Sequence, residues 1–215
     1  MKITKLGHSC LIIEIKEINI LIDPGSWTIE QHQKIKDIDI ILITHKHADH
    51  LHLESFKEII KNNPEAAIYT NSDVGEVLSG QGISFKVLEG IASAEAKGIK
   101  LEAFDCEHEE IYSPVVPLPK NTGYFIDEKF FYPGDSLTEP NRDIEIMGLP
   151  IAGPFMTLAQ GIDYAKKVKP KKCFPMHDGM IKEESLIIYY KITQKALEKD
   201  EIEFVPIEIG NAVEF

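Results

Sequence analysis

Cysteine and tryptophan are scarce in this sequence of 215 residues, which has three cysteines and one tryptophan. Cys10, Cys106 and Cys173 are an odd number and lack paired metal-binding spacing, so a disulfide framework and a cysteine-bound metal are both disfavoured. We expect these side chains to be small buried hydrophobic groups in a reducing cytoplasm. Long apolar runs are also absent: none approaches the roughly 20 residues that span a membrane, and the first eight residues lack a signal-peptide core. The sequence thus predicts a cytoplasmic protein without a membrane span.

Positive charge is in short supply as well. The chain has 23 Lys and Arg residues against 35 Asp and Glu residues, a net charge of −12 and an isoelectric point of about 5.1. A surface of this sign repels phosphate backbones, which disfavours nucleic acid as a partner and favours a small-molecule substrate. The one basic cluster, Lys166–Lys172, lies at the end of a predicted helix. Lysines there complement the helix dipole as a solvated cap, and an anion clamp is the alternative interpretation.

The remaining composition fits a single α/β domain over residues 1–215. Hydrophobic residues make up 43% and charged residues 27%, which is ordinary for a globular protein. Runs rich in β-branched residues alternate with helical periodicity, without a repeat or a long linker. Strands are expected near 11–15, 18–22, 38–43, 67–69, 84–88, 99–105, 123–126, 130–132, 173–175 and 202–206. Helices are expected near 53–60, 72–78, 157–168 and 183–199.

The last of these helices carries an apolar stripe that includes Leu186, Ile187 and Tyr190. Such a stripe is typical of a helix face that packs on the core, and less often of an interface. We therefore expect these residues to be buried, and a homo-oligomer stays open as an alternative.

The segment Thr44-His45-Lys46-His47-Ala48-Asp49-His50 directly follows the buried run 38–43. His45 and His47 are two residues apart, so an extended backbone directs both side chains the same way. Asp49 and His50 come next, and a turn there would let them face a second ion beside the first. Imidazole and carboxylate ligands suit zinc, manganese or iron. This spacing indicates a metal site rather than a polar loop that is rich in histidine by chance.

This His-X-His-X-Asp-His run resembles the hallmark of the metallo-β-lactamase superfamily. Further similar segments occur in the order of that family: Leu21–Gly25, Phe104–His108, Tyr132–Ser136 and Phe174–Gly179. The start, Leu6–Leu11, is similar to a subgroup of small metal-dependent hydrolases related to ascorbate-phosphate lactonases and N-acyl-phosphatidylethanolamine phospholipases. The resemblance implies a four-layer αββα sandwich with the site on loops at one edge of the packed sheets.

The resemblance also implies a dinuclear site with a defined set of ligands. The first ion would be held by His45, His47 and His108. The second would be held by Asp49, His50 and His177, with Asp135 bridging the two ions. The implied cofactor is a pair of divalent ions, zinc first, with manganese or iron as alternatives.

Three further features allow two interpretations each. Asp23 either orients a ligand histidine or only serves the turn at Pro24-Gly25. His8 is either a pocket group near the ions or a buried structural histidine. The segment Leu149–Thr157 either lines the substrate pocket or simply connects a strand to a helix.

The implied reaction is hydrolysis. A hydroxide held by the two ions would attack a small-molecule ester, lactone or phosphodiester, with Asp49 and Asp135 as the catalytic carboxylates. Position 47 is histidine rather than the glutamate of the flavodiiron branch, which favours hydrolysis over redox chemistry. Two alternatives stay open: a ribonuclease or other nucleic-acid phosphodiesterase, and a non-catalytic metal-binding member of the fold.

Overall fold

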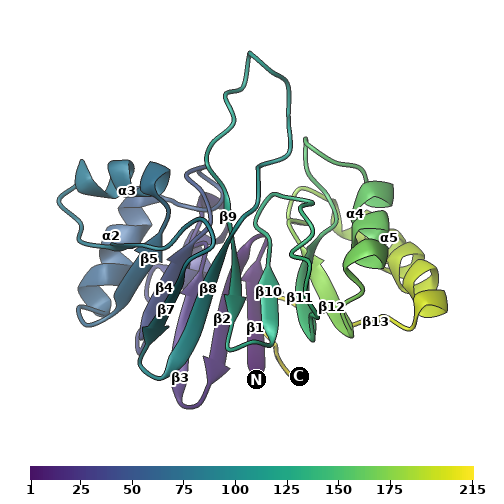
Figure 1. Ribbon diagram of the computed structural model, residues 1–215, viewed down its shortest axis with the longest axis horizontal. Coiled ribbons are helices and arrows are strands. Elements are labelled where there is room, and N and C mark those ends of the chain that lie inside the picture. The colour runs from purple at the N-terminus through teal and green to yellow at the C-terminus, as the bar shows by residue number, and fades with distance from the viewer.

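Two β-sheets lie face to face in the centre of the protein, and the computed structural model describes all residues from 1 to 215. Each sheet has seven strands. Helices α2 (Leu53–Asn62) and α3 (Ser72–Ser79) lie on one side, and α4 (Leu158–Val168) and α5 (Glu183–Leu197) lie on the other (Figure 1). The expected four-layer αββα sandwich is confirmed.

Three hydrophobic clusters hold these layers together. The largest joins the two sheets and includes Ile13 and Ile20 of the first sheet and Tyr124 and Phe174 of the second. Another cluster fills the space between the second sheet and helices α4 and α5, and a third lies between the first sheet and helices α2 and α3. Because both faces of each sheet are covered, a central strand such as β4 (Ile40–Ile43) is apolar at every position.

The first sheet has the strand order β14-β1-β2-β3-β4-β5-β6. Strands β14, β1, β2 and β3 pair antiparallel, whereas β3 to β6 pair parallel. Besides β4, its strands are β1 (Lys2–Gly7), β2 (Cys10–Ile15), β3 (Ile18–Ile22), β5 (Ala67–Thr70), β6 (Lys86–Val87) and β14 (Ala212–Glu214). The short helices η1 (Ser26–Thr28) and α1 (Ile29–His32) follow β3.

The second sheet has the strand order β13-β12-β11-β10-β9-β8-β7. Strands β7 to β10 pair antiparallel and β10 to β13 pair parallel, so each sheet is antiparallel in one part and parallel in the other. Its strands are β7 (Ser93–Ala96), β8 (Ile99–Asp105), β9 (Thr122–Ile126), β10 (Phe130–Tyr132), β11 (Ile146–Pro150), β12 (Lys172–Met176) and β13 (Glu203–Phe204).

Helices α2, α3 and α4 begin at residues whose side chains cap them. The His52 ring accepts a hydrogen bond from the backbone of Ser55 at the start of α2. Thr157 and Gln160 form a capping box that fixes the start of α4. No helix is both long and apolar enough to cross a bilayer.

Several elements differ from those expected. Strands β1, β7, β11 and β14 and helix α1 were not predicted, and β6 and β13 are shorter than the runs 84–88 and 202–206. Strand β1 is short and contains lysines, and β11 contains Gly148 and ends at Pro150. Lysine, glycine and proline all disfavour strands, so the sequence pattern of these two segments is weak. The last helix ends at Leu197, and the short η2 (Glu198–Asp200) continues it.

The expectation that the apolar stripe of α5 is buried is wrong for one of its residues. Ile187 is 56% exposed, whereas Tyr190 is partly buried against the outer cluster of the second sheet. The buried residues of the helix are Thr193 and Leu197. The helix therefore packs on the sheet mainly through its second half, and its first half projects apolar side chains into solvent.

Candidate metal centre

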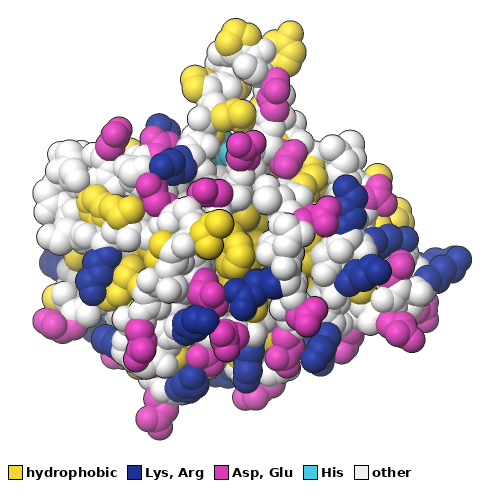
Figure 2. All heavy atoms as spheres, viewed as in Figure 1, with side chains coloured by type: hydrophobic (Ala, Val, Ile, Leu, Met, Phe, Trp, Pro, Cys, Tyr) yellow, Lys and Arg dark blue, Asp and Glu magenta, His cyan; other side chains and the backbone are white.

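The seven predicted ligands meet at one edge of the sandwich, where each follows the carboxyl end of a strand. Four of the ligands follow β4: His45, His47, Asp49 and His50. Those that follow β8, β10 and β12 are His108, Asp135 and His177, respectively. Figure 2 shows histidine at the foot of the long segment that projects between β8 and β9. Ligands that are more than 100 residues apart in the chain are thus brought into one place by the sheet edges.

One group of four side chains consists of His45, His47, His108 and Asp135, whose ligand atoms all lie within 4.8 Å of one another. The Nε2 atom of His45 is 3.1 Å from Nδ1 of His47. The Oδ2 atom of Asp135 lies 3.8 Å from Nε2 of His45 and 3.6 Å from Nε2 of His108. Three imidazoles and one carboxylate therefore surround a single point.

A second group lies on the other side of Asp135. It contains Asp49, His50 and His177, together with His8, again with ligand atoms within 4.8 Å of one another. The Oδ1 atom of Asp135 is 3.2 Å from Nε2 of His50, and its Oδ2 atom is 3.1 Å from Nε2 of His177. Asp135 thus contacts ligand atoms of both groups, as a bridging carboxylate would.

Four buried atoms of these groups make no hydrogen bond: Nε2 of His50, His108 and His177, and Oδ1 of Asp135. An unsatisfied buried polar atom costs about 1–3 kcal/mol, so four that converge on one place need a common partner. Imidazole nitrogen and carboxylate oxygen are ligands for zinc and related divalent ions. The residues present therefore fit two such ions.

Asp23 fixes the orientation of two of the histidines. It is fully buried after β3 and accepts hydrogen bonds from Thr44 N (2.8 Å), Thr44 Oγ1 (2.7 Å) and His50 Nδ1 (2.7 Å). Because the single hydroxyl proton of Thr44 goes to Asp23, Thr44 Oγ1 accepts from His45 Nδ1 at 3.1 Å. The Nε2 lone pairs of both rings are then free for metal. This contact network supports the orienting role of Asp23 over a simple turn.

His8 combines its two expected roles. Its Nδ1 accepts a hydrogen bond from the backbone of Gly179 at 3.1 Å, so in the neutral ring the proton is on Nε2, which donates to Asp49 Oδ2 at 3.1 Å. Burial lowers the pKa of His8 to about 4, which keeps the ring neutral. With both nitrogens engaged, His8 orients Asp49 and is not itself free to bind metal.

Backbone carbonyls orient two further histidines. His177 Nδ1 donates to the carbonyl of Ala152 at 2.7 Å, and His108 Nδ1 donates to the carbonyl of Glu109 at 2.6 Å. The Nε2 atoms of both rings are left to face Asp135. Such outer hydrogen bonds fix the tautomer of a ligand histidine and raise its basicity.

Two glycines let backbone segments approach the centre closely. A Cβ atom at Gly25 would lie 1.8 Å from the carbonyl oxygen of Asp49, so only glycine fits against this segment. Gly134 has φ +65, and a Cβ there would lie 2.2 Å from Oδ1 of Asn121. Asn121 in turn accepts from the backbone of Asp135 at 3.3 Å. Asn121 was not predicted to belong to the site, because no local pattern marks it. Thr44 lies in the predicted segment Thr44–His50, but no role was predicted for its side chain.

The comparisons with known proteins agree with this geometry. The family model of the β-lactamase superfamily domain matches residues 2–177. The chain belongs to the metallo-β-lactamase superfamily.

Relatives within this superfamily are similar over most of the chain. Protein Rv0786c of Mycobacterium tuberculosis is 28% identical over 195 residues, which cover 88% of this chain and 90% of that protein. The metal-dependent hydrolase MJ1163 of Methanocaldococcus jannaschii is 28% identical over 192 residues, covering 81% and 83% of the two chains. The metallo hydrolase Igni18 of Ignicoccus hospitalis has the same fold, with a TM-score of 0.76 at 21% identity and with 100% and 98% of the two chains covered.

The predictions of superfamily, fold and enzyme class, a metal-dependent hydrolase, are therefore confirmed. The names of these relatives do not specify a substrate or a metal.

A cavity of about 290 Å³ opens beside the two groups. Its lining residues are His47, Ala48, Asp49, Ile111, Asp135, Pro154, Phe155 and His177. Pro154 and Phe155 come from the segment Leu149–Thr157, so this segment does line the pocket. Ligand side chains make up part of this lining, and Ile111, Pro154 and Phe155 form its apolar wall.

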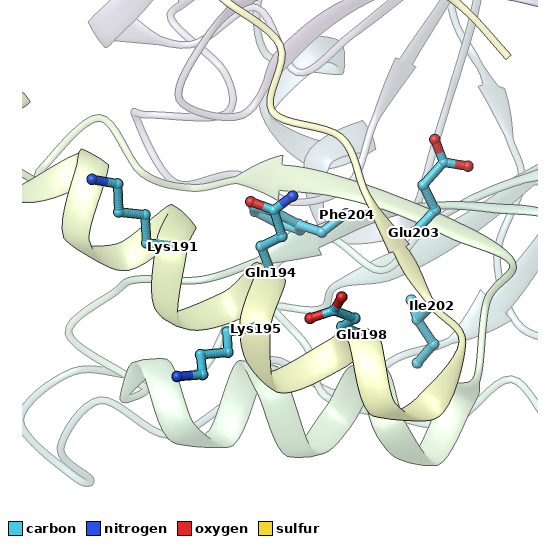
Figure 3. Close-up of a pocket in the computed structure, with 7 residues that line it drawn as sticks. All are labelled: Lys191, Gln194, Lys195, Glu198, Ile202, Glu203 and Phe204. Atoms are coloured by element: carbon cyan, nitrogen blue, oxygen red, sulfur yellow. The ribbon is translucent and has the colours of Figure 1, made fainter.

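A hollow of about 340 Å³ between α5 and β13 has a different character (Figure 3). It is lined by Lys191, Gln194, Lys195, Glu198, Ile202, Glu203 and Phe204. Its lysines and Glu203 point in different directions, so no set of side chains converges on a ligand.

The basic cluster Lys166–Lys172 lies at the far end of β12 from His177. Lys166 pairs with Asp200 at 3.3 Å and Lys172 with Glu203 at 3.1 Å. The cluster thus belongs to the end of α4 and the start of β12, which supports a solvated cap rather than an anion clamp.

A buried ion pair stands next to the last ligand and was not predicted. Lys5 of β1 donates through Nζ to Asp178 Oδ2 at 2.6 Å and to the carbonyl of Pro175 at 2.7 Å. The Tyr190 hydroxyl donates to the same Asp178 oxygen at 2.6 Å. Burial lowers the pKa of Lys5, against the opposing charge of Asp178. This group connects β1, the turn after His177 and α5.

Replacing Lys5 by methionine is expected to lower the free energy of unfolding by about 3–5 kcal/mol, because Asp178 would be left buried without its cation. Urea unfolding in the presence of a chelator measures this loss. Lys2→Met is the matched control on the same strand: its pair with Glu14 is solvent-exposed and is worth about 0–1 kcal/mol. Equal losses in the two variants would contradict a structural role for the buried pair.

The charges of the metal-free centre predict how metal binding depends on pH. Burial alone would lower the pKa of His177, but Asp135 and Asp49 outweigh it and raise that pKa to about 9. Burial also lowers the pKa of His50, but Asp135 and Asp23 raise it by more. The pKa of His50 therefore lies well above its usual value. Below about pH 9 a cation must therefore displace a proton from the His177 ring, and at neutral pH it must displace one from the His50 ring as well.

Metal affinity should then rise as the pH increases toward about 9, and binding near pH 7 should release about one to two protons. Isothermal titration in two buffers of different ionisation enthalpy measures the release directly. An observed heat that is independent of the buffer at pH 7 would show that these rings are already neutral.

Proposed function

We propose that the protein is a dinuclear metal-dependent hydrolase that acts on an ester, lactone or phosphodiester of a small molecule. The observation that carries this proposal is the position of Asp135 between two groups of ligand atoms. Three of these atoms, Nε2 of His50, His108 and His177, are buried without a hydrogen-bonding partner. We assign His45, His47 and His108 to one ion and Asp49, His50 and His177 to the other. Zinc suits this set of imidazoles and carboxylates best, and manganese or iron would also fit it.

Two divalent ions held here would supply Lewis acidity, activating water and polarising a carbonyl or phosphoryl oxygen. The carboxylates keep the negative charge that such ions need. Burial would raise the pKa of Asp135, but the charges on His177 and His50 hold it well below its usual value. Burial would also raise the pKa of Asp49, but its close contacts with His177 and His8 hold that pKa far below its usual value.

Access to the centre is one-sided. His45, His50, His108 and His177 are buried, whereas His47 and Asp49 are partly exposed and face the cavity. A substrate would therefore approach past these two residues. His8 holds the Asp49 carboxylate through Nε2, so that its orientation is set before substrate arrives.

A small molecule suits this site better than a nucleic acid. The chain carries a net charge of −12, and two lysines of the basic cluster, Lys166 and Lys172, pair with acids away from the centre. The three cysteines are all free and buried, which supports a reducing, cytoplasmic setting for the enzyme.

Metal analysis combined with a substrate panel tests the proposal. Protein loaded with zinc, manganese or iron is expected to hold two ions per chain and to hydrolyse at least one of three probes. The probes are 4-nitrophenyl acetate, a γ-lactone and bis(4-nitrophenyl) phosphate. Two bound ions without any hydrolysis would favour the non-catalytic alternative. A folded protein that binds no ion would overturn the metal centre itself.

A further inference from the structure

The segment Ile111–Pro119, here called the apolar arm, projects beyond both sheets between β8 and β9 (Figure 1). Its sequence is Ile-Tyr-Ser-Pro-Val-Val-Pro-Leu-Pro, nine residues without a single charged side chain. Charged residues make up 27% of the whole chain, and the arm is bordered by Glu109 and Glu110 on one side and Lys120 on the other. The arm is thus a local break in an otherwise charged surface.

The apolar side chains of the arm face solvent. Tyr112 is 68% exposed, Val115 is 72% exposed and Leu118 is 49% exposed. Figure 2 shows hydrophobic side chains gathered at the tip of the projection. Single exposed apolar residues are ordinary, but a contiguous group on one projecting segment marks a binding surface.

The arm is continuous with the apolar wall of the metal pocket. Ile111, its first residue, lines the pocket together with Pro154 and Phe155. The Phe155 ring lies 5.5 Å from the His108 ring and 5.1 Å from the His177 ring, measured between centroids. An apolar surface therefore begins at the ligands and extends outward along the arm.

The base of the arm is fastened to the metal centre. The backbone of Glu109 donates to the carbonyl of Asp135 at 2.9 Å, and the Glu109 carboxylate accepts from the backbone of Leu137 at 3.0 Å. Within the arm, Val116 N donates to the carbonyl of Tyr112 at 2.9 Å. Three of its nine residues are prolines, which fix φ and lower the entropy lost when a ligand binds.

We propose that the apolar arm binds the hydrocarbon chain of an amphiphilic substrate while the scissile group lies at the metal centre. This inference rests on the proposed function and names its substrate class. Phe155 and Ile111 line the pocket, and the exposed side chains of Val115 and Leu118 lie farther along the same arm, where a linear acyl or alkyl chain that leaves the pocket would meet them. The net charge of −12 and the glutamates at the arm's base disfavour docking on an anionic lipid surface.

A chain-length series tests the inference. We expect kcat/KM for 4-nitrophenyl esters to rise about two- to fourfold per methylene from acetate to octanoate, because each added methylene would contact a partly open apolar surface. All esters are used below the concentrations at which they aggregate. In the double variant Val115→Ser with Leu118→Ser, the octanoate-to-acetate ratio should fall at least tenfold. Ile91→Ser is the matched control, because Ile91 is 96% exposed and lies outside the arm; it should keep the wild-type ratio.

Binding to the metal-free protein gives a readout that does not depend on catalysis. N-octylacetamide, an uncharged probe with a stable amide, should bind wild type and Ile91→Ser in a calorimetric titration and bind the double variant at least tenfold more weakly. If no ester, lactone or phosphodiester probe is hydrolysed but this difference in binding is observed, the proposed function fails and the arm's role stands. If acetate is hydrolysed but neither the rates nor the binding depend on the arm, the arm's role is overturned.

Two further measurements identify a competing occupant. The first is sedimentation with phosphatidylcholine vesicles. If wild type and Ile91→Ser sediment with the vesicles, the double variant does not, and the rates show no chain-length effect, the arm binds a membrane surface and the proposal is overturned. Light scattering that shows a dimer in wild type and a monomer in the double variant, again without a chain-length effect, would assign the arm to a second copy. Circular dichroism should show all variants folded, because the replaced side chains are exposed.

Discussion

Protein in which Asp135 is replaced by asparagine is expected to lose affinity for both ions. Asp135 has one oxygen 3.2 Å from Nε2 of His50 and the other within 3.8 Å of the Nε2 atoms of His45, His108 and His177. A neutral amide removes the only charge shared by the two positions. Loss of an outer hydrogen-bonding partner already costs about 10–100-fold in metal affinity, so losing the bridging ligand should cost more than about 100-fold at each position.

Competition with a chromophoric chelator measures the two affinities, and plasma mass spectrometry gives the stoichiometry. The matched control is Asp143→Asn, which removes the same charge from an exposed position. It should bind two ions as wild type does. If Asp135→Asn loses only one ion, Asp135 is a terminal ligand of that ion and the bridging assignment is wrong.

Replacing His47 by alanine is expected to abolish hydrolysis and empty the first metal position while the protein stays folded. The His47 ring is partly exposed at the pocket, so removing it leaves no sealed cavity in the core. Its Nδ1 atom is 3.1 Å from Nε2 of His45, where both rings face the same point. The expected loss in kcat/KM is at least about 1000-fold, because the Lewis acid leaves together with its ligand.

Lys46→Ala is the control for this variant. Lys46 is the adjacent residue, and its side chain pairs with Asp73 at the surface and not with the metal centre. It should keep both ions and near wild-type rates. Normal metal content in His47→Ala would refute the assignment of His47 as a ligand.

Much of the candidate site could be predicted because its ligands follow strands in short local patterns. The segment Thr44–His50 lies directly after β4, and its spacing alone points to metal. The positions of His108, Asp135 and His177 required the resemblance to the superfamily. For these three, the structure adds the distances to one another, which no local pattern contains.

The supporting contacts could not be predicted from the sequence. Asn121 and Gly25 act through backbone groups far away in the chain, and Lys5 meets Asp178 across 173 residues. A lysine in a short strand ordinarily indicates an exposed edge, yet here it is buried because Asp178 and a backbone carbonyl satisfy it. Such pairs depend on the fold and become visible only once both sheets are placed.

The fold could be predicted from the sequence where a strand is buried on both faces, as β4 is. It was harder to predict where a segment becomes a strand only because neighbouring strands pair with it. Strand β11 contains Gly148 because a Cβ atom there would lie 2.9 Å from the Tyr132 ring of the neighbouring strand. Its presence in the sheet follows from parallel pairing with β10 and β12. Strand propensity does not predict such pairing, because it is assigned to one segment at a time.

The order of the ligands along the chain has a consequence for how the enzyme is made. His45, His47, His108 and Asp135 all precede β11, whereas His177 follows β12, and β1 finds its last partner only in β14 at the end of the chain. As the polypeptide leaves the ribosome, the proposed set for one ion is complete once Asp135 has been synthesised, whereas the set for the other also needs His177. The ligands proposed for the first ion are therefore all present in the nascent chain before strands β11 to β14 are translated, so this ion is the first whose ligand set is complete.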